Sequence, residues 1–189
     1  MADSEPQKAR PGVLVVLAVV AIAAIAIDQF SKFLVVSNLR LGEVVPVVGD
    51  LIQFHFVKNS GAAFSIGNAY TWIFSILAAA VTVVIIWFAR RIRSLGWAWV
   101  FGLLLGGTIG NLIDRLFREP GFGVGHVIDF LTIPLLPAIF NVADVCITSA
   151  MVLFLILTLR GVGLDGTRGP KAEPVGDTSV SPRDDREQV

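Results

Sequence analysis

Four long apolar segments limit what this chain can fold into more than any other feature of its sequence. They extend roughly over residues 13–36, 69–89, 96–117 and 138–159. As a helix, each segment is long enough to span the roughly 30 Å of hydrocarbon in a bilayer. Only 16% of the residues are charged, against about 25% in soluble domains. We therefore predict an all-α membrane protein with four transmembrane helices.

The first apolar segment also has features of a cleaved secretory signal peptide. Lys8 and Arg10 precede an apolar stretch that is rich in alanine. The stretch resumes after Asp28 as "FLVV", however, so it is longer than the apolar core of a signal peptide needs to be. A transmembrane helix is therefore the preferred interpretation, and cleavage is the alternative.

The basic residues predict the orientation of these helices. If both termini are cytoplasmic, ten of the fifteen basic residues lie on that side, including the "RRIR" cluster at 90–93. We therefore expect a multi-pass protein of the cytoplasmic (inner) membrane. The fifteen acidic residues balance the fifteen basic ones, so no basic surface predicts a nucleic-acid partner. Nothing in the sequence requires more than a monomer.

In this orientation both long connections face outward. The first, about 37–68, contains the β-prone run "EVVPVVGDLIQFHFV" with a Gly49-Asp50 turn signal. The second, about 118–137, is rich in Gly and Pro around the strand-like "HVIDFLTI". We therefore expect a small β-rich extracytoplasmic subdomain that lies on the outer membrane face.

The domain organisation follows from these segments. Residues 1–12 form a cytoplasmic N-terminal extension, and residues 13–160 form the membrane domain. Residues 161–189 are polar, rich in Gly, Pro and Ser, and free of aromatic residues. This composition predicts a disordered cytoplasmic tail.

Several polar residues of the membrane domain gather near one outer level. A charged side chain at the centre of a membrane helix costs about 2.5–3.5 kcal/mol on insertion scales, so such residues suggest a functional site. If the fourth helix begins at Ala138, Asp144 lies roughly 9 Å inward from its start. The residues at this level are Asp28, Asn111, Asp114, Arg115, Asp129, Asn141 and Asp144.

Salt bridges between helices are an alternative explanation for some of these charges. Asp28 and Lys32 are four residues apart and share a helix face, and Asp114 is next to Arg115. Asp129 has no adjacent basic residue to pair with.

The segments "IDQFSK" at Ile27 and "IDRLFR" at Ile113 share a pattern, which leaves internal duplication and chance both open.

The third segment contains a line of glycines. Gly102, Gly106 and Gly110 are spaced four apart in "GLLLGGTIGN", and such a line of small residues lets two helices approach closely. We expect this line to bring the face with Asn111 and Arg115 close to a neighbouring helix.

The residue types exclude several catalytic chemistries. The sequence has no H-E-x-x-H or G-x-S-x-G motif, and Ser60 has no histidine on a facing helix to activate it. His126, three residues from Asp129, is a weak indication of a metal site. Cys146 is the single cysteine, so no internal disulfide can form. We expect no metal and no cofactor.

What remains is the carboxylate pair Asp129 and Asp144. Two aspartates held together in a low-dielectric site cannot both ionise, so they share a proton. Such a pair can activate water for attack on a peptide bond. The same carboxylates could serve a small proton- or ion-coupled transporter subunit, or only stabilise a structural membrane protein. The residues alone leave these alternatives open.

Five segments in this order resemble lipoprotein signal peptidase (signal peptidase II). They are "DQFSK" at 28–32, "VKNSGAAFS" at 57–65, "GGTIGNLIDR" at 106–115, "VIDF" at 127–130 and "FNVAD" at 140–144. The resemblance covers about residues 13–160. It implies a membrane aspartic endopeptidase that cleaves diacylglyceryl-modified prolipoproteins before the lipidated lipobox cysteine and is inhibited by the cyclic peptide globomycin.

The resemblance also implies roles for individual residues. It makes Asp129 and Asp144 the catalytic pair, near the extracytoplasmic face and in contact with membrane lipid and the prolipoprotein substrate. Asp114 and Gly110 are expected to be structural residues near the site. The residues expected to bind substrate or position the pair are Asn59, Asn111, Arg115, Asn141, Asp28 and Lys32.

Overall fold

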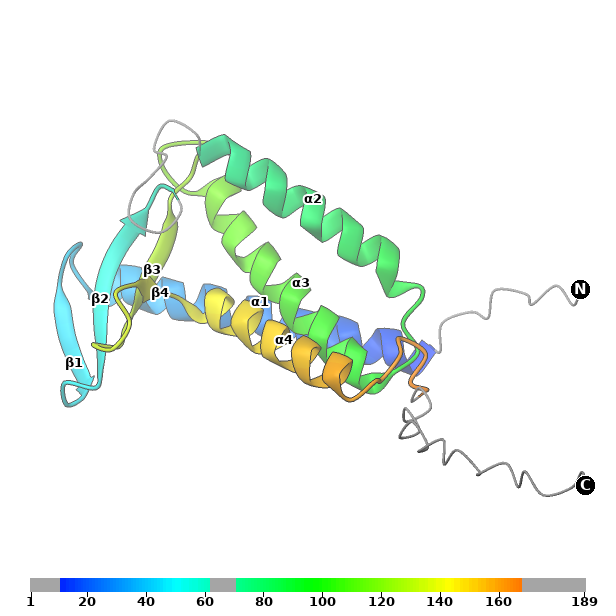
Figure 1. Cartoon of the computed structure of the whole chain (residues 1–189). Coiled ribbons are helices and arrows are strands. Elements are labelled where there is room, and N and C mark those ends of the chain that lie inside the picture. Colours follow the sequence, from blue (N-terminus) through cyan, green and yellow to red (C-terminus); the bar gives the residue numbers. More distant parts are fainter. Residues whose placement is uncertain (1–10, 62–70, 168–189) are drawn as a thin grey trace, which may run out of the picture.

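Four helices and a small sheet make up the fold of the computed structural model, which describes residues 11–61 and 71–167 (Figure 1). All four helices are long and apolar enough to cross a membrane, which confirms the predicted transmembrane segments. The helices are α1 (Pro11–Asn38), α2 (Thr71–Ala89), α3 (Leu95–Phe117) and α4 (Val142–Leu159); the strands are β1 (Val44–Val48), β2 (Ile52–Asn59), β3 (Val127–Thr132) and β4 (Ile139–Phe140).

The sheet lies at one end of the helices, which we call the sheet end. The short turn between α2 and α3 lies at the opposite end, together with the start of α1 and the end of α4 (Figure 1). We call this the turn end. The two long connections of the chain therefore meet at one end of the molecule, as the sequence predicts.

Helix α3 is the centre of the bundle. In the most apolar 18-residue stretch of α3, half of the residues are buried, against 11% in the corresponding stretches of α2 and α4. It packs against all three other helices. Because the other helices leave most of their apolar side chains exposed, those side chains form the surface that lipid would cover.

The glycine line of α3 forms its contact with α1, as predicted. A methyl group at Gly102 would lie 2.8 Å from Cβ of Val20, and one at Gly106 would lie 2.6 Å from Cβ of Ala24. On another face of α3, a methyl group at Gly107 would lie 2.5 Å from the carbonyl oxygen of Ala143. Glycine thus lets both α1 and the start of α4 approach the backbone of α3.

The sheet is antiparallel with the strand order β1-β2-β3-β4. The β-prone run of the first connection forms the β1–β2 hairpin, and Gly49 in its turn has a φ of 51°, a conformation that glycine adopts without strain. Pro46 lies on the edge strand β1, where the missing N–H removes no bond from a central ladder.

The two faces of the sheet have different surroundings. In the β2–β3 pair, Val57 lies opposite Asp129 and Lys58 lies opposite Ile128. Because side chains alternate along a strand, Asn59 and Asp129 share one face, which we call the carboxylate face. Lys58 and Ile128 lie on the other, which we call the back face. The back face packs on the end of α1 through Ile128 and Val35.

The predicted start of the fourth helix at Ala138 is wrong. Ile139 and Phe140 form β4, which pairs with the end of β3, and α4 begins only at Val142. A short apolar run has the same composition in a strand as in a buried helix. As a result Asp144 lies in the first turn of α4, about 3 Å from its start, and not 9 Å inward.

The end of the described chain is folded onto the turn end. Val162 and Leu164 pack against the helix core, and the Trp97 indole N–H donates to the Val162 carbonyl over 3.0 Å. Packing against the helices thus continues past residue 160 to Leu164. The rest of the predicted tail, and residues 1–10, lie outside the described part of the chain.

We expect Gly106→Ala to destabilise the protein, because the new methyl group would also lie 2.8 Å from the Ala21 carbonyl oxygen. Overpacking of this kind costs about 1–3 kcal/mol. Gly12→Ala in α1 is the matched control, since no atom lies within 4 Å of the added carbon. Thermal unfolding in detergent should show a lower midpoint for Gly106→Ala only. Equal midpoints for the two variants would contradict the close α1–α3 contact.

Candidate active site

A chain of four alternating charges lies where α1 meets α3. The Lys32 ammonium is 2.8 Å from the Asp28 carboxylate and 2.7 Å from the Asp114 carboxylate. The second oxygen of Asp114 accepts a bond from Nε of Arg118 at 2.5 Å. Asp28, Lys32 and Asp114 are fully buried, so each charge depends on its partners for compensation.

This charge chain holds other elements of the fold in place. Asp28 accepts a hydrogen bond from the backbone N–H of Ala143 in α4, at 2.9 Å. Asp114 accepts one from the backbone N–H of Ile128 in β3, at 3.3 Å. The Gln29 amide donates to both carboxylates. The start of α4 and the strand β3 are therefore both anchored to the buried charges.

Of the two salt bridges considered as an alternative, Asp28 with Lys32 forms, whereas Asp114 does not pair with Arg115. Adjacent residues on a helix point in different directions, while residues four apart share a face. Asp114 therefore pairs with Arg118 within its own helix. Gly110 makes room for this cluster, because a methyl group there would lie 2.7 Å from the Asp28 carboxylate.

Asn111 connects the buried charges to Asp144. The Lys32 ammonium donates to Oδ1 of Asn111 over 3.0 Å, and Nδ2 of Asn111 donates to Oδ1 of Asp144 over 2.9 Å. An ammonium group can only donate, so it requires the amide oxygen on its own side. The amide nitrogen must therefore face Asp144.

Asn141 links the two carboxylates Asp129 and Asp144. It is the N-cap of α4: its Oδ1 accepts from the N–H of Asp144 at 3.0 Å, and its own N–H donates to Oδ2 of Asp144 at 3.1 Å. This reciprocal pair is a capping box. Nδ2 of Asn141 donates to Oδ1 of Asp129 at 2.6 Å and to Oδ1 of Asn111 at 3.1 Å.

Asp129 is almost completely buried on the carboxylate face of the sheet. Its other oxygen accepts a hydrogen bond from Nδ2 of Asn59 over 2.8 Å. Burial raises the pKa of Asp129 to about 6; the neighbouring charge of Asp144 contributes to the rise, and the hydrogen bonds from Asn59 and Asn141 oppose it. This carboxylate can therefore exchange a proton near neutral pH.

Asp144 is more accessible than Asp129. It is half-buried and lies at a hollow of about 320 Å³ beside α4. The rest of this lining is mainly apolar and comes from Leu136, Phe140, Val145, Thr148 and Ser149. Asp144 therefore borders a space that an apolar ligand could fill.

Arg115 lies on the other side of the site and makes few polar contacts. Its Nη2 donates to the carbonyl oxygen of Gly61 at 3.3 Å, and its guanidinium lies 5.3 Å from the ring centre of Phe74. Its buried Nη1 has no hydrogen-bond partner in the described part of the chain. Arg115 therefore keeps hydrogen-bonding capacity that the described residues do not use.

The structure thus brings the predicted site residues into one connected network, except Arg115, which borders it through Gly61. Sequence reasoning missed Gln29 and Arg118. Gln29 lies inside the "DQFSK" segment, and Arg118 follows Asp114 at the same spacing as Lys32 follows Asp28, so the similarity of "IDQFSK" and "IDRLFR" carried the missing signal. The catalytic and binding roles of the site residues remain predictions.

Comparisons with known proteins show the family to which this chain is similar. Residues 20–160 match the family model described as signal peptidase (SPase) II. A lipoprotein signal peptidase of Leifsonia xyli is 63% identical and aligns over 94% of this chain and 82% of its own length. That of Mycobacterium avium is 42% identical over 86% of this chain and 89% of its own length.

A solved bacterial membrane enzyme has the same fold. Its structure was determined by the in meso method and superposes with a TM-score of 0.71 at 23% identity, over 90% of this chain and 99% of that one. A second such structure gives a TM-score of 0.69 at 24% identity, over 82% and 98%. With four membrane-spanning helices and a family match over most of its length, this chain belongs to the signal peptidase II family of membrane proteases.

Proposed function

We propose that this chain removes signal peptides from diacylglyceryl-modified prolipoproteins by cutting before the lipidated lipobox cysteine. Asp129 and Asp144 would form an aspartic dyad that activates water. The observation that supports this most is the Asn141 side chain, which hydrogen-bonds to the Asp129 carboxylate and to the N–H of Asp144. Family membership supports peptide hydrolysis over the ion-coupled transport that the same carboxylates would also permit.

In this mechanism the two carboxyl groups share one proton. The ionised member takes a proton from water as the water oxygen attacks the scissile carbonyl carbon. The protonated member donates a hydrogen bond to that carbonyl and then gives its proton to the leaving nitrogen. The two groups titrate as a coupled pair, so the shared proton belongs to the dyad and not to one aspartate.

The neighbouring side chains would position the dyad and the substrate. Asn59 and Asn111 each donate to one member of the pair, and Lys32 orients Asn111 from behind. Asp28 and Asp114 compensate the charge of Lys32. The free Nη1 of Arg115 would bind a backbone carbonyl of the substrate.

The position of the site suits a lipid-modified substrate. We propose that both termini are cytoplasmic and that the sheet end faces the outside of the cytoplasmic membrane, so that the dyad meets the scissile bond near the outer interface. The apolar hollow beside Asp144 would accept an apolar part of the substrate directly from the membrane. The protein would act as a monomer and without a cofactor.

Replacing either aspartate of the dyad tests this proposal. We expect Asp129→Asn and Asp144→Asn to lower kcat for a diacylglyceryl lipobox peptide by about 10²–10⁴-fold, because general acid–base transfer is lost. The matched control is Asp50→Asn, which changes an exposed aspartate in the β1–β2 turn. Cleavage by purified protein, with and without globomycin, is the measurement.

The stability of these variants separates catalysis from structure. The pKa of Asp129 is raised from 3.8 to about 6, so protonation favours the folded state; this contribution to stability is complete below about pH 4 and is lost as the pH rises through about 6. Both oxygens of Asp129 accept from amide nitrogens, of Asn59 and of Asn141, so the amide of Asp129→Asn would set one donor against another and should lower the unfolding temperature. Cleavage is therefore measured below the unfolding temperature of each variant. Normal cleavage by either variant would overturn the dyad, and inactivity that comes only with unfolding would favour a structural role.

The hydrogen bond from Asn59 gives a pH prediction. It stabilises the ionised form of Asp129, so Asn59→Ala should raise the pKa of Asp129 above about 6. The ionisation near pH 6 in the profile of kcat/KM should then move to higher pH. Gln53→Ala, on the same strand but away from the dyad, should leave it in place. An unshifted profile in Asn59→Ala would contradict the assignment.

A further inference from the structure

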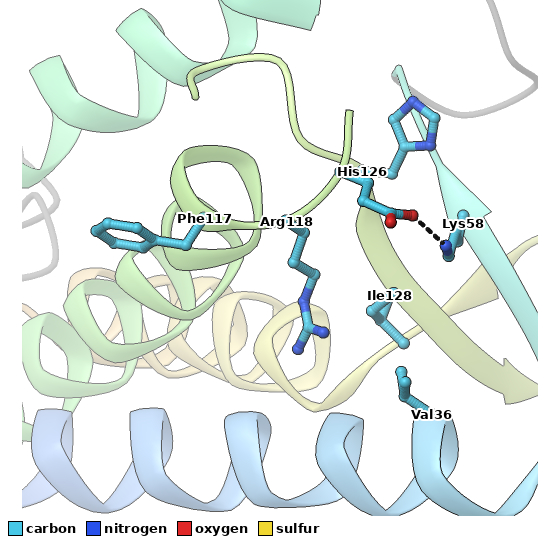
Figure 2. Close-up of a pocket in the computed structure, with 7 residues that line it drawn as sticks. Val36, Lys58, Phe117, Arg118, His126 and Ile128 are labelled. Atoms are coloured by element: carbon cyan, nitrogen blue, oxygen red, sulfur yellow. Dashed lines mark hydrogen bonds and ion pairs between the residues drawn. The ribbon is translucent and has the colours of Figure 1, made fainter. Parts of the chain in front are cut away.

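A second pocket lies at the sheet end, outside the candidate active site. It has a volume of about 330 Å³ and lies between the ends of α1 and α3 and the strands β2 and β3 (Figure 2). Its lining combines apolar and charged side chains from these elements. They are Val36, Lys58, Phe117, Arg118, Glu119, His126 and Ile128.

This pocket is on the back face of the sheet. Lys58 and Ile128 lie opposite each other in the β2–β3 pair, and both line the pocket. Their neighbours Asn59 and Asp129 point to the carboxylate face, since side chains alternate along a strand. The pocket is thus separated from the dyad by the thickness of the sheet.

Arg118 presents two free donor groups to this pocket. Its Nε is held by the buried carboxylate of Asp114, while its Nη groups make no hydrogen bond within the described residues. Figure 2 shows its guanidinium extended from the end of α3 toward Val36 on α1. Because Asp114 already fixes the guanidinium, a ligand that binds it loses little additional conformational freedom.

Lys58 supplies a second cation. Its ammonium is 3.1 Å from the carboxylate of Glu119, but the Glu119 side chain is 84% exposed. An exposed ion pair of this kind contributes little, so Lys58 can turn to a bound anion at small cost. The charged groups that line the pocket are Lys58, Arg118 and Glu119. The charge of Arg118 is compensated by Asp114 and that of Lys58 by the exposed Glu119, so the two cations serve the pocket as hydrogen-bond donors.

The apolar part of the lining indicates where the pocket meets the membrane. Phe117 is the last residue of α3 and is 75% exposed, and Val36 is two residues before the end of α1 and is 43% exposed. Ends of membrane helices lie where hydrocarbon gives way to the polar headgroups. Apolar and cationic groups therefore meet at the depth where a phospholipid has its glycerol and phosphate.

We propose that this pocket binds the phosphodiester headgroup of a glycerophospholipid from the leaflet on the sheet side. The Nη groups of Arg118 and the ammonium of Lys58 donate to the phosphate oxygens, and His126 lies at the same rim as a further donor. Val36 and Phe117 contact the upper part of the acyl chains.

Lipid retention by the full-length protein tests this proposal. The purified protein in detergent is mixed with phosphatidylglycerol, with diacylglycerol, which has the same chains but no phosphate, or with inorganic phosphate, and bound molecules are counted by native mass spectrometry. We expect one phosphatidylglycerol per chain at concentrations where diacylglycerol does not bind. Equal binding of the two lipids would overturn the phosphate site. Displacement by millimolar inorganic phosphate would show a free-phosphate site and overturn the lipid assignment.

Lys58→Gln is the main variant because the exposed Lys58 is not part of the charge chain beneath the dyad. It should weaken phosphatidylglycerol binding about tenfold, as expected for one charge-assisted contact. Arg40→Gln removes another exposed cation from the same end of the molecule, outside the pocket, and should bind as the parent does. Equal loss in both variants would mean only general attraction of anionic lipid, and no loss in either would exclude the pocket.

Phe117→Ser provides a second, independent variant at an exposed position. It should weaken binding of the lipid by reducing contact with the acyl chains. These measurements do not depend on peptide cleavage. A failure of lipid binding with intact cleavage would overturn this proposal alone, and lipid binding by a chain that does not cleave would overturn only the proposed function.

Discussion

The contact on which the rest of this structure depends is the one between the Lys32 ammonium and the carboxylates of Asp28 and Asp114. Moving a charge into the apolar interior costs several kcal/mol per ion even after relaxation. With Arg118 as the fourth member, the formal charges sum to zero. Removing any one member would leave a buried charge without compensation. Such an arrangement tolerates few alternatives, so it fixes how α1 and α3 lie against each other at the sheet end.

The site is built outward from this contact through groups whose orientation is determined one after another. Lys32 can only donate, so it sets the direction of the Asn111 amide, and Asn111 then donates to Asp144. Asn141 caps α4 with its oxygen and therefore has its nitrogen free for Asp129. Preorganised donors of this kind hold a reactive pair in place without further ordering during a reaction. The helix cap and the dyad contact thus use the same side chain.

Most of the fold follows from the sequence because long apolar runs and a four-residue glycine spacing have few structural solutions in a membrane. The β1–β2 hairpin also follows from its composition. The start of α4 does not, since Ala138, Ile139 and Phe140 read equally well as helix or strand; the capping pattern from Asn141 to Asp144 was the better signal. Pairing of Asp114 with Arg118 depends on helix geometry, which the i, i+4 rule supplies. Contacts such as Ile128 N–H to Asp114 depend on tertiary packing and have no local pattern.

Asp114 connects the two faces of the sheet through its two carboxylate oxygens. One of its oxygens accepts from the N–H of Ile128, the residue before Asp129, and the other accepts from Arg118, which lines the back-face pocket. The carboxylate face and the back face therefore share a single buried anchor at the end of α3. Because β3 has only six residues, a shift of this anchor would move residues on both faces together. The position of Asp129 relative to α4 therefore depends on the contact between Asp114 of α3 and strand β3, and not on the sheet alone.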